Sequence, residues 1–287
     1  MPETEIYVAR GGRAALTATR GAAAPSAYSI VVRFEGGLTE TQKNAFKAAA
    51  DRWSRVIVGD LPAVSIGGEV IDDLLISARG VAIDGVLGTL GRAGPTQLRP
   101  RSAGAFAFLP AMGMMEFDTA DLANMEANGS LNDVIAHEMG HVIGIGTIWD
   151  DKGFLRGAGS ATPTFTGPQA MREFATLRGT GRPEPVPVEN RGGPGTRDSH
   201  WQDSLFGNEL MTGFVERAGN PLSRMTVASL QDLGYTVDLG AAEPYSLPPP
   251  AVMATRGAAG VRELHGGDGV ILSTEPVELP PESLVTR

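Results

Sequence analysis

Residues 137–146 read His-Glu-Met-Gly-His-Val-Ile-Gly-Ile-Gly and contain two of the four histidines in the chain. The apolar residues in and before this stretch recur at helical spacing. Ser130 is an expected N-cap, and Gly144 is the type of residue at which helices end. The sequence therefore predicts a helix over about 131–143 that carries both histidines.

The two histidines of this helix indicate a metal site. Because His137 and His141 are four residues apart, they share one helix face and can bind one zinc ion together. Glu138 follows the first histidine, where its carboxylate can reach a water whose pKa zinc lowers towards about 7. Glu138 can accept a proton from that water and pass it to a leaving amine. The H-E-x-x-H pattern alone occurs in many unrelated chains, but its place in a strongly periodic helix favours a metal site over two surface histidines.

Composition excludes several other kinds of site and partner. The chain has no cysteine, which excludes disulfides, cysteine zinc ligands and thiol nucleophiles. The net charge is -9 and there is no long basic run, so no nucleic-acid partner is expected. No apolar stretch approaches the roughly 18–20 residues that span a bilayer, and the N-terminus shows no apolar core typical of a signal peptide.

Local patterns elsewhere predict both strands and helices. Residues 28–34 are β-branched and aromatic, as in a strand. Thr39 and Gln42 form a capping box that begins a helix over about 40–58. Another helix is expected from its N-cap Ser223 to Leu233. Further strands are expected at 73–78, 81–90, 106–109 and 112–117.

The residues after the second histidine resemble a known clan. A catalytic zinc needs a third protein ligand and an open fourth position. Gly144, three residues after His141, lets the chain turn back towards the metal, as in the metzincins. The compact metzincin pattern has histidine, or aspartate in the snapalysin-like variant, at the position of Thr147. The sequence instead resembles the leishmanolysin-like zinc metallopeptidases, a metzincin branch with a long insertion before the third histidine.

This resemblance covers roughly residues 28–240 and implies the rest of the site. It implies His200, in Ser-His-Trp, as the third ligand of one catalytic zinc ion. It implies Met211, in Glu-Leu-Met-Thr-Gly, as the methionine of the tight turn beneath the metal, and Gly213 leaves no tyrosine ligand in that turn. The implied activity is a zinc endopeptidase that acts on proteins or peptides. Because the eukaryotic relatives are rich in disulfides, the cysteine-free chain looks like a bacterial-type member.

The resemblance also implies an α+β fold, a metzincin-like catalytic domain with two lobes. The upper lobe, about 28–146, is expected to hold a twisted mixed sheet, a backing helix and the zinc-binding helix. An insertion and an irregular lower lobe are expected over about 147–240. Substrate is expected to lie in the cleft between the lobes and to pair with an edge strand, for which 104–117 is our choice.

The two ends of the chain lie outside this expected domain. Residues 1–27 are expected to be a flexible arm. Residues 241–287 are rich in proline and glycine and are expected to be an extended tail with one strand near 269–273. The resemblance implies a secreted or cell-surface protein, although no signal peptide is visible and a cytoplasmic location stays open. Oligomeric state, substrate specificity and any latency through Glu3 or Glu5 are not indicated.

Alternatives stay open for the third ligand and for the function. Glu173, on a short helix expected at 169–177, would be the third ligand in a gluzincin-like arrangement, and Asp150 and Asp151 are further candidates. A catalytically silent, zinc-stabilised binding or adhesion module on the same scaffold is the alternative function. Loss of Glu138 would be its signature.

Other polar residues receive ordinary roles. The pairs Asp72 with Asp73 and Asp118 with Asp121 can bind calcium, but roles in turns and helix caps are favoured. His265, the remaining histidine, lies in a glycine-rich segment and is expected to be exposed.

Overall fold

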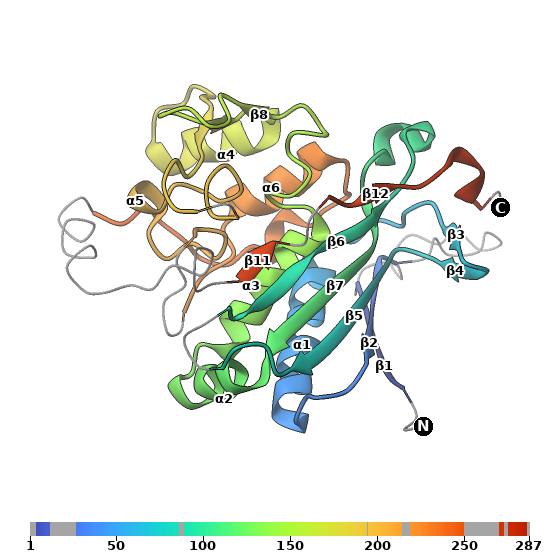
Figure 1. Ribbon diagram of the computed structural model, residues 1–287. Coiled ribbons are helices and arrows are strands. Elements are labelled where there is room, and N and C mark those ends of the chain that lie inside the picture. Colours follow the sequence, from blue (N-terminus) through green and yellow to red (C-terminus); the bar gives the residue numbers. More distant parts are fainter. Residues whose placement is uncertain are drawn as a thin grey trace.

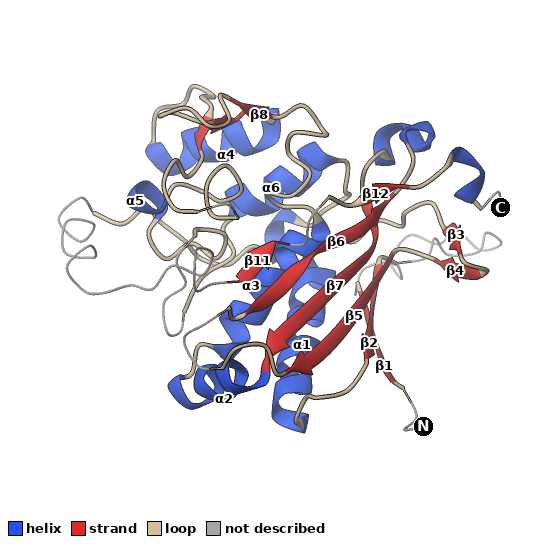
Figure 2. Cartoon of the chain, viewed as in Figure 1, coloured by secondary structure: helices blue, strands red, loops and turns tan. Residues whose placement is uncertain are grey.

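The computed structural model shows a mixed α+β chain. A twisted mixed sheet has helices against one face, and a second region of short helices and loops lies beside it (Figures 1 and 2). The residues that the structure describes are 4–11, 27–85, 89–193, 195–213, 219–249, 270–272 and 275–285.

The sheet has the spatial order β1-β2-β5-β7-β6-β11, and β12 also pairs with β6. Strands β2, β5 and β7 run parallel to one another, while β1 and β6 are antiparallel to their neighbours β2 and β7. The strands are β1 (Glu5–Arg10), β2 (Ser29–Phe34), β5 (Leu74–Val81), β6 (Gly91–Leu98), β7 (Pro110–Asp118), β11 (Val270–Leu272) and β12 (Val277–Glu278). A separate hairpin consists of β3 (Val64–Ile66) and β4 (Glu69–Ile71).

Two helices pack against each other beside the sheet, and one of them carries the histidine motif. Helix α1 (Glu40–Val56) begins at the predicted capping box, in which Thr39 and Gln42 bond each other's backbone. Its buried Trp53 donates a hydrogen bond of 2.8 Å from Nε1 to the carbonyl oxygen of Ala136 in helix α3 (Leu131–Ile143). This bond holds α3, the motif helix, against α1, the backing helix. Helix α2 (Thr119–Asn128) precedes α3 in the chain.

The region after α3 has little regular structure. Its elements are β8 (Leu155–Arg156), β9 (Thr164–Phe165), β10 (Val186–Pro187), α4 (Pro168–Arg178), α5 (Asp203–Phe206), α6 (Arg224–Leu233) and the turn of 3-10 helix η2 (Leu239–Ala241). Its core is aromatic, with ring centroids of Trp149 and Trp201 4.6 Å apart and those of Phe165 and Trp201 5.6 Å apart. Such aromatic contacts stabilise a region that has few backbone hydrogen bonds between strands.

Several expected elements are confirmed, and two strands were placed wrongly. The strand at 28–34 and the helices at 40–58, 131–143, 169–177 and 223–233 are present. The expected strand at 81–90 is wrong over its described residues, because pairing to β7 selects Gly91–Leu98 instead, and 86–88 lie outside the described residues. The expected strand at 106–109 is also wrong, because this stretch follows the 3-10 helix η1 (Arg101–Phe106) in the β6–β7 connection.

The expected flexible arm is corrected in part. Glu5–Arg10 forms β1, in which Tyr7 donates a hydrogen bond of 2.8 Å to Asp51 on α1. Glu5 forms ion pairs with Lys43 and Lys47 of the same helix. These ion pairs hold β1 against α1. The stretch 12–26 lies outside the described residues.

The substrate-edge assignment of 104–117 is wrong. Strand β7 lies between β5 and β6, so its backbone is paired on both sides. On the far side of β7 lies β6, whose outer side pairs with β11 at Gly91–Ala93 and with β12 at Gln97 and Leu98 (Figure 1). The expected strand near 269–273 is therefore present as β11, and the described strands of the tail, β11 and β12, are paired with the sheet. After β12, η3 (Pro281–Ser283) brings Leu284 into a bridge with Val64.

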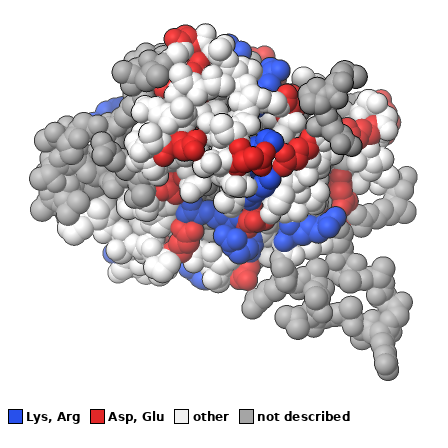
Figure 3. All heavy atoms as spheres, turned by 90° about the horizontal axis from the view of Figure 1, so that it is seen from below, with Lys and Arg blue, Asp and Glu red and all other residues white. Residues whose placement is uncertain are grey.

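Charge is mixed on the molecular surface. On the face shown in Figure 3, acidic and basic side chains of the described residues lie side by side. Among the described residues, no helix has the length and apolarity needed to cross a membrane. The proposed domain boundaries and the absence of a nucleic-acid partner stay predictions.

Candidate metal centre

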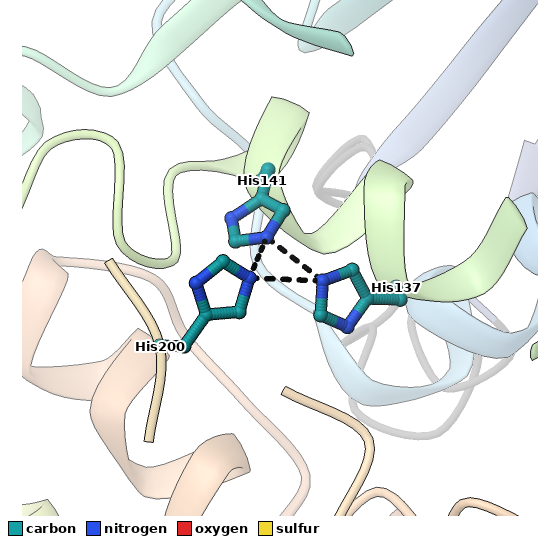
Figure 4. A group of neighbouring side chains, drawn as sticks. All are labelled: His137, His141 and His200. Atoms are coloured by element: carbon teal, nitrogen blue, oxygen red, sulfur yellow. Dashed lines mark hydrogen bonds between the residues drawn. The ribbon is translucent and has the colours of Figure 1, made fainter. Parts of the chain in front are cut away.

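Three histidines from two distant segments meet on one side of α3. His137 and His141 project from the helix, and His200 comes from the loop between β10 and α5 (Figure 4). The three Nε2 atoms form a triangle with sides of 3.0 Å (137–141), 3.1 Å (137–200) and 2.9 Å (141–200). All three side chains are fully buried.

The opposite ring nitrogens fix the orientation of each imidazole. Nδ1 of His137 lies 2.6 Å from the carbonyl oxygen of Leu210, Nδ1 of His141 2.8 Å from that of Ile145, and Nδ1 of His200 2.9 Å from that of Thr196. A carbonyl oxygen only accepts, so these contacts assign the proton to Nδ1 in every ring. Each neutral ring then directs the lone pair of Nε2 towards the other two.

This arrangement fits a metal ion. Three acceptor nitrogens about 3 Å apart repel one another unless a cation lies among them. A tetrahedral zinc ion with Zn–N bonds of about 2.0–2.1 Å places its ligand atoms about 3.3 Å apart, close to the distances seen here. Backbone carbonyls that receive Nδ1–H are the usual supports of zinc-binding histidines. The three histidines therefore form a group that can hold a metal.

Burial shapes the protonation of the motif. It lowers the pKa of His137 to about 4, which keeps the ring neutral and available as a ligand. Glu138 is also fully buried, and burial raises the pKa of its carboxyl well above the usual value. A divalent cation held by the neighbouring histidines would favour the ionised carboxylate. The motif thus provides both neutral ligands and a carboxyl whose proton affinity depends on metal.

Glycines bring the third histidine to the helix. Gly144 ends α3 with a φ of 121°, and Gly146 follows with a φ of 78°. A Cβ atom on Gly146 would lie 2.0 Å from the carbonyl oxygen of Ser199, so only a glycine allows this approach. Thr147, where compact metzincins have a ligand, donates a hydrogen bond of 2.8 Å to the carbonyl oxygen of His141.

Met211 packs against the helix between the two histidines. A Cβ atom on Gly140 would lie 2.7 Å from Met211 Sδ, and Met211 is fully buried. The carbonyl oxygen of Met211 accepts a hydrogen bond of 3.0 Å from the N–H of Trp201, the residue after His200. Met211 is thereby linked to both segments that carry the histidines.

The other candidate ligands lie outside the three-histidine group. Glu173 on α4 forms an ion pair with Arg224 on α6, with Oε2 and Nε 2.9 Å apart. Glu173, Asp150 and Asp151 do not belong to the described groups that can hold a metal, whereas His200 does. The geometry therefore favours His200 over a gluzincin-like ligand set.

The acidic pairs mostly have the structural roles expected of them. Asp118 caps α2 by accepting from the N–H of Ala120 at 2.8 Å. Asp73 accepts from the N–H groups of Ser29 and Leu61. Carboxylate oxygens of Asp60, Asp72 and Asp73 also lie within 4.8 Å of one another, near the β3–β4 hairpin, and form a second described group that could hold a cation. His265 lies outside the described residues.

Sequence reasoning missed the supports of the histidines. The acceptors at Ile145, Thr196 and Leu210 are backbone carbonyls, which have no side-chain signature. It also missed buried Glu209, which accepts from the N–H of Met211 at 2.7 Å. An acid directly before the apolar pair Leu210 and Met211 was the available signal.

Comparison with known proteins agrees with this geometry. The family model described as leishmanolysin matches residues 105–247, a range that includes the three histidines, Glu138 and Met211. Two proteins named leishmanolysin-like peptidase, from Caenorhabditis elegans and Caenorhabditis briggsae, are each 38% identical to the chain over 69 residues. That match covers 24% of this chain and 10% of each relative, so it spans about a tenth of the relatives' length. The chain is thus similar to leishmanolysin-type metallopeptidases, and its mixed α+β fold is consistent with such a domain.

Proposed function

We propose that the protein is a zinc-dependent endopeptidase of the leishmanolysin-like branch of the metzincins. His137, His141 and His200 are the zinc ligands, and Glu138 is the general base. The observation that carries this proposal is the convergence of three buried Nε2 lone pairs from two distant segments. The match of the leishmanolysin family model over 105–247 supports peptide hydrolysis as the reaction.

In this proposal, Glu138 moves the proton that peptide hydrolysis requires. A zinc ion held by His137, His141 and His200 would supply Lewis-acid chemistry at a peptide carbonyl and at a water molecule. Glu138 accepts a proton as the water oxygen bonds to the carbonyl carbon, and donates it to the amine nitrogen as the C–N bond breaks. A buried carboxyl with a raised pKa is suited to the second step.

Further assignments follow from the resemblance. Met211 is the methionine of the metzincin Met-turn, and Gly144 ends the zinc-binding helix so that the chain can return to the metal. Proteins or peptides are the substrates, and the protein is extracellular or on the cell surface. The cysteine-free composition supports a bacterial-type member. A silent binding module would not need Glu138, and the retained buried carboxyl on α3 supports the enzyme instead.

The ligand set can be tested with two substitutions. His200→Ala removes one of the three nitrogen ligands, so the purified protein should lose bound zinc and the ability to cleave casein. Glu173→Gln is the matched control, because it breaks only the α4–α6 ion pair and should retain both properties. Zinc is measured by elemental analysis beside casein cleavage. If Glu173→Gln loses zinc while His200→Ala retains it, the proposed ligand set is wrong.

A further inference from the structure

Glu209 lies where the segments that support the histidines meet. We propose that Glu209 is a positioning residue that sets the geometry of the three-histidine site through the Met211 turn and Trp201. The inference rests on the proposed function in that it takes the histidines to be zinc ligands.

The carboxylate of Glu209 ties the Met211 turn to the start of α6. Glu209 is fully buried. Its Oε2 accepts from the N–H of Met211 at 2.7 Å, and its Oε1 accepts from the N–H of Ser223 at 3.1 Å and from Ser223 Oγ at 2.7 Å. Ser223 is the N-cap of α6, where the helix dipole favours a negative charge. One side chain therefore fixes the turn relative to the helix.

From this turn, a short path leads to His137. Leu210 lies between Glu209 and Met211, and its carbonyl oxygen is the acceptor for His137 Nδ1 at 2.6 Å. The N–H of Leu210 donates to the carbonyl oxygen of Pro221 at 2.9 Å. The Leu210 carbonyl lies in the same peptide plane as the N–H of Met211, which donates to Glu209. This hydrogen bond therefore fixes the plane of the carbonyl and, through it, the direction of the His137 imidazole.

A second path leads to His200. Thr226 Oγ1 donates a hydrogen bond to Glu209 Oε1 and accepts one of 2.8 Å from Trp201 Nε1. The backbone N–H of Trp201 also donates to the carbonyl oxygen of Met211. Trp201 follows His200 directly, so its indole and backbone both fix the approach of the third histidine.

The arrangement requires a carboxylate. Burial raises the pKa of Glu209, while hydrogen bonds from Thr226, Ser223 and Met211 oppose that rise. A glutamine has nearly the same volume but only one acceptor oxygen. With glutamine at position 209, the N–H of Met211 or of Ser223 would face an NH2 group, and the turn would shift. Glu209→Gln therefore disturbs the positioning while changing little else.

Metal binding tests this inference without relying on catalysis. We would measure the zinc dissociation constant by chelator competition and the visible absorption of the Co2+-substituted protein, which reports ligand geometry. The matched control is Asp232→Asn, also on α6. Asp232 accepts from the N–H groups of Gln169 and Ala170 at 2.9 Å, so its substitution disturbs the start of α4 instead.

The inference predicts that Glu209→Gln raises the zinc dissociation constant about 10- to 100-fold and changes the Co2+ spectrum. Asp232→Asn should match the wild-type protein in both measurements. Thr226→Val keeps the side-chain shape and removes the hydrogen bonds of Thr226 Oγ1 with Glu209, Ser223 and Trp201. It should therefore change the Co2+ spectrum, and it provides a second test if Glu209→Gln fails to fold.

Wild-type zinc affinity and an unchanged spectrum in Glu209→Gln would overturn the inference, as would an equal change in Asp232→Asn. If Glu209→Gln fails to fold, an unchanged Co2+ spectrum in Thr226→Val would also overturn the inference. Failure of the wild-type protein to bind zinc would overturn the proposed function as well. Zinc binding by the wild-type protein therefore distinguishes failure of the Glu209 inference from failure of the proposed function.

Discussion

Gly146 and Ser199 are in direct backbone contact: a Cβ atom on Gly146 would lie 2.0 Å from the carbonyl oxygen of Ser199. Gly146 lies just beyond the end of the motif helix, and Ser199 immediately precedes His200. Only a residue without a side chain allows the two segments to approach in this way. The contact thereby connects a glycine of the motif stretch to the placement of a histidine more than fifty residues away.

Gly146→Ala should lower both zinc affinity and stability. The added methyl group cannot fit against Ser199, and the φ of 78° is strained for alanine. Gly153→Ala is the control, because Gly153 has a φ of 70° but open space at the Cβ position. Both variants should lose about 1 kcal/mol or more in urea unfolding, but only Gly146→Ala should bind zinc more weakly. Equal zinc affinity in the two variants would contradict the proposed role of the contact.

Gly140→Ala should destabilise the protein although it lies within a helix. On an exposed helix, glycine to alanine gains about 1 kcal/mol. Here the methyl group would lie 2.7 Å from Met211 Sδ and 2.9 Å from the Trp53 ring, and such overpacking costs about 1–3 kcal/mol. Combined with Met211→Ala, the substitution should cost less than the sum of the single changes, as measured by a double-mutant cycle. Strict additivity would show that Gly140 and Met211 are not in contact.

The metal-free protein should lose stability on mild acidification. The pKa of His137 is about 4 in the fold and about 6.5 in the unfolded chain, so below 6.5 only the unfolded chain takes up the proton. The stabilisation is present above pH 6.5 and is lost as the pH falls towards 4. At pH 5 the loss is roughly 2 kcal/mol relative to pH 7.5.

Urea unfolding in the presence of a chelator measures this loss. Other groups titrate over the same range, so the comparison is with His137→Gln, in which this contribution is absent. The wild-type protein should lose more stability than the variant between pH 7.5 and 5. Parallel pH profiles would mean that His137 is not held neutral by burial.

The local signals in the sequence predicted the helices and the two histidines of the motif helix, His137 and His141. The capping box at Thr39 and Gln42 and the apolar period of 131–143 act within a few residues, so they appear in the sequence as they do in the fold. His200 and Met211 could be selected only through the family resemblance, because no local pattern connects them to the helix.

Strand β6 shows why other parts could not be predicted. It contains Gly91, Gly94 and Pro95, which are poor strand formers, and it is a strand because it pairs with β7 on one side and with the tail on the other. Pairing between distant segments overrides local preference. The same holds for the carbonyl acceptors of the histidines, which depend on backbone positions set by the whole fold.

The most direct test of the account compares casein cleavage by the zinc-loaded protein and by its Glu138→Ala variant, with the zinc content of both determined. Glu138 is not among the three nitrogen ligands, so both proteins should bind one zinc ion. The account predicts that the wild-type protein cleaves casein and that the variant does not. Equal cleavage by the two proteins would show that Glu138 is not the base and would contradict the central claim.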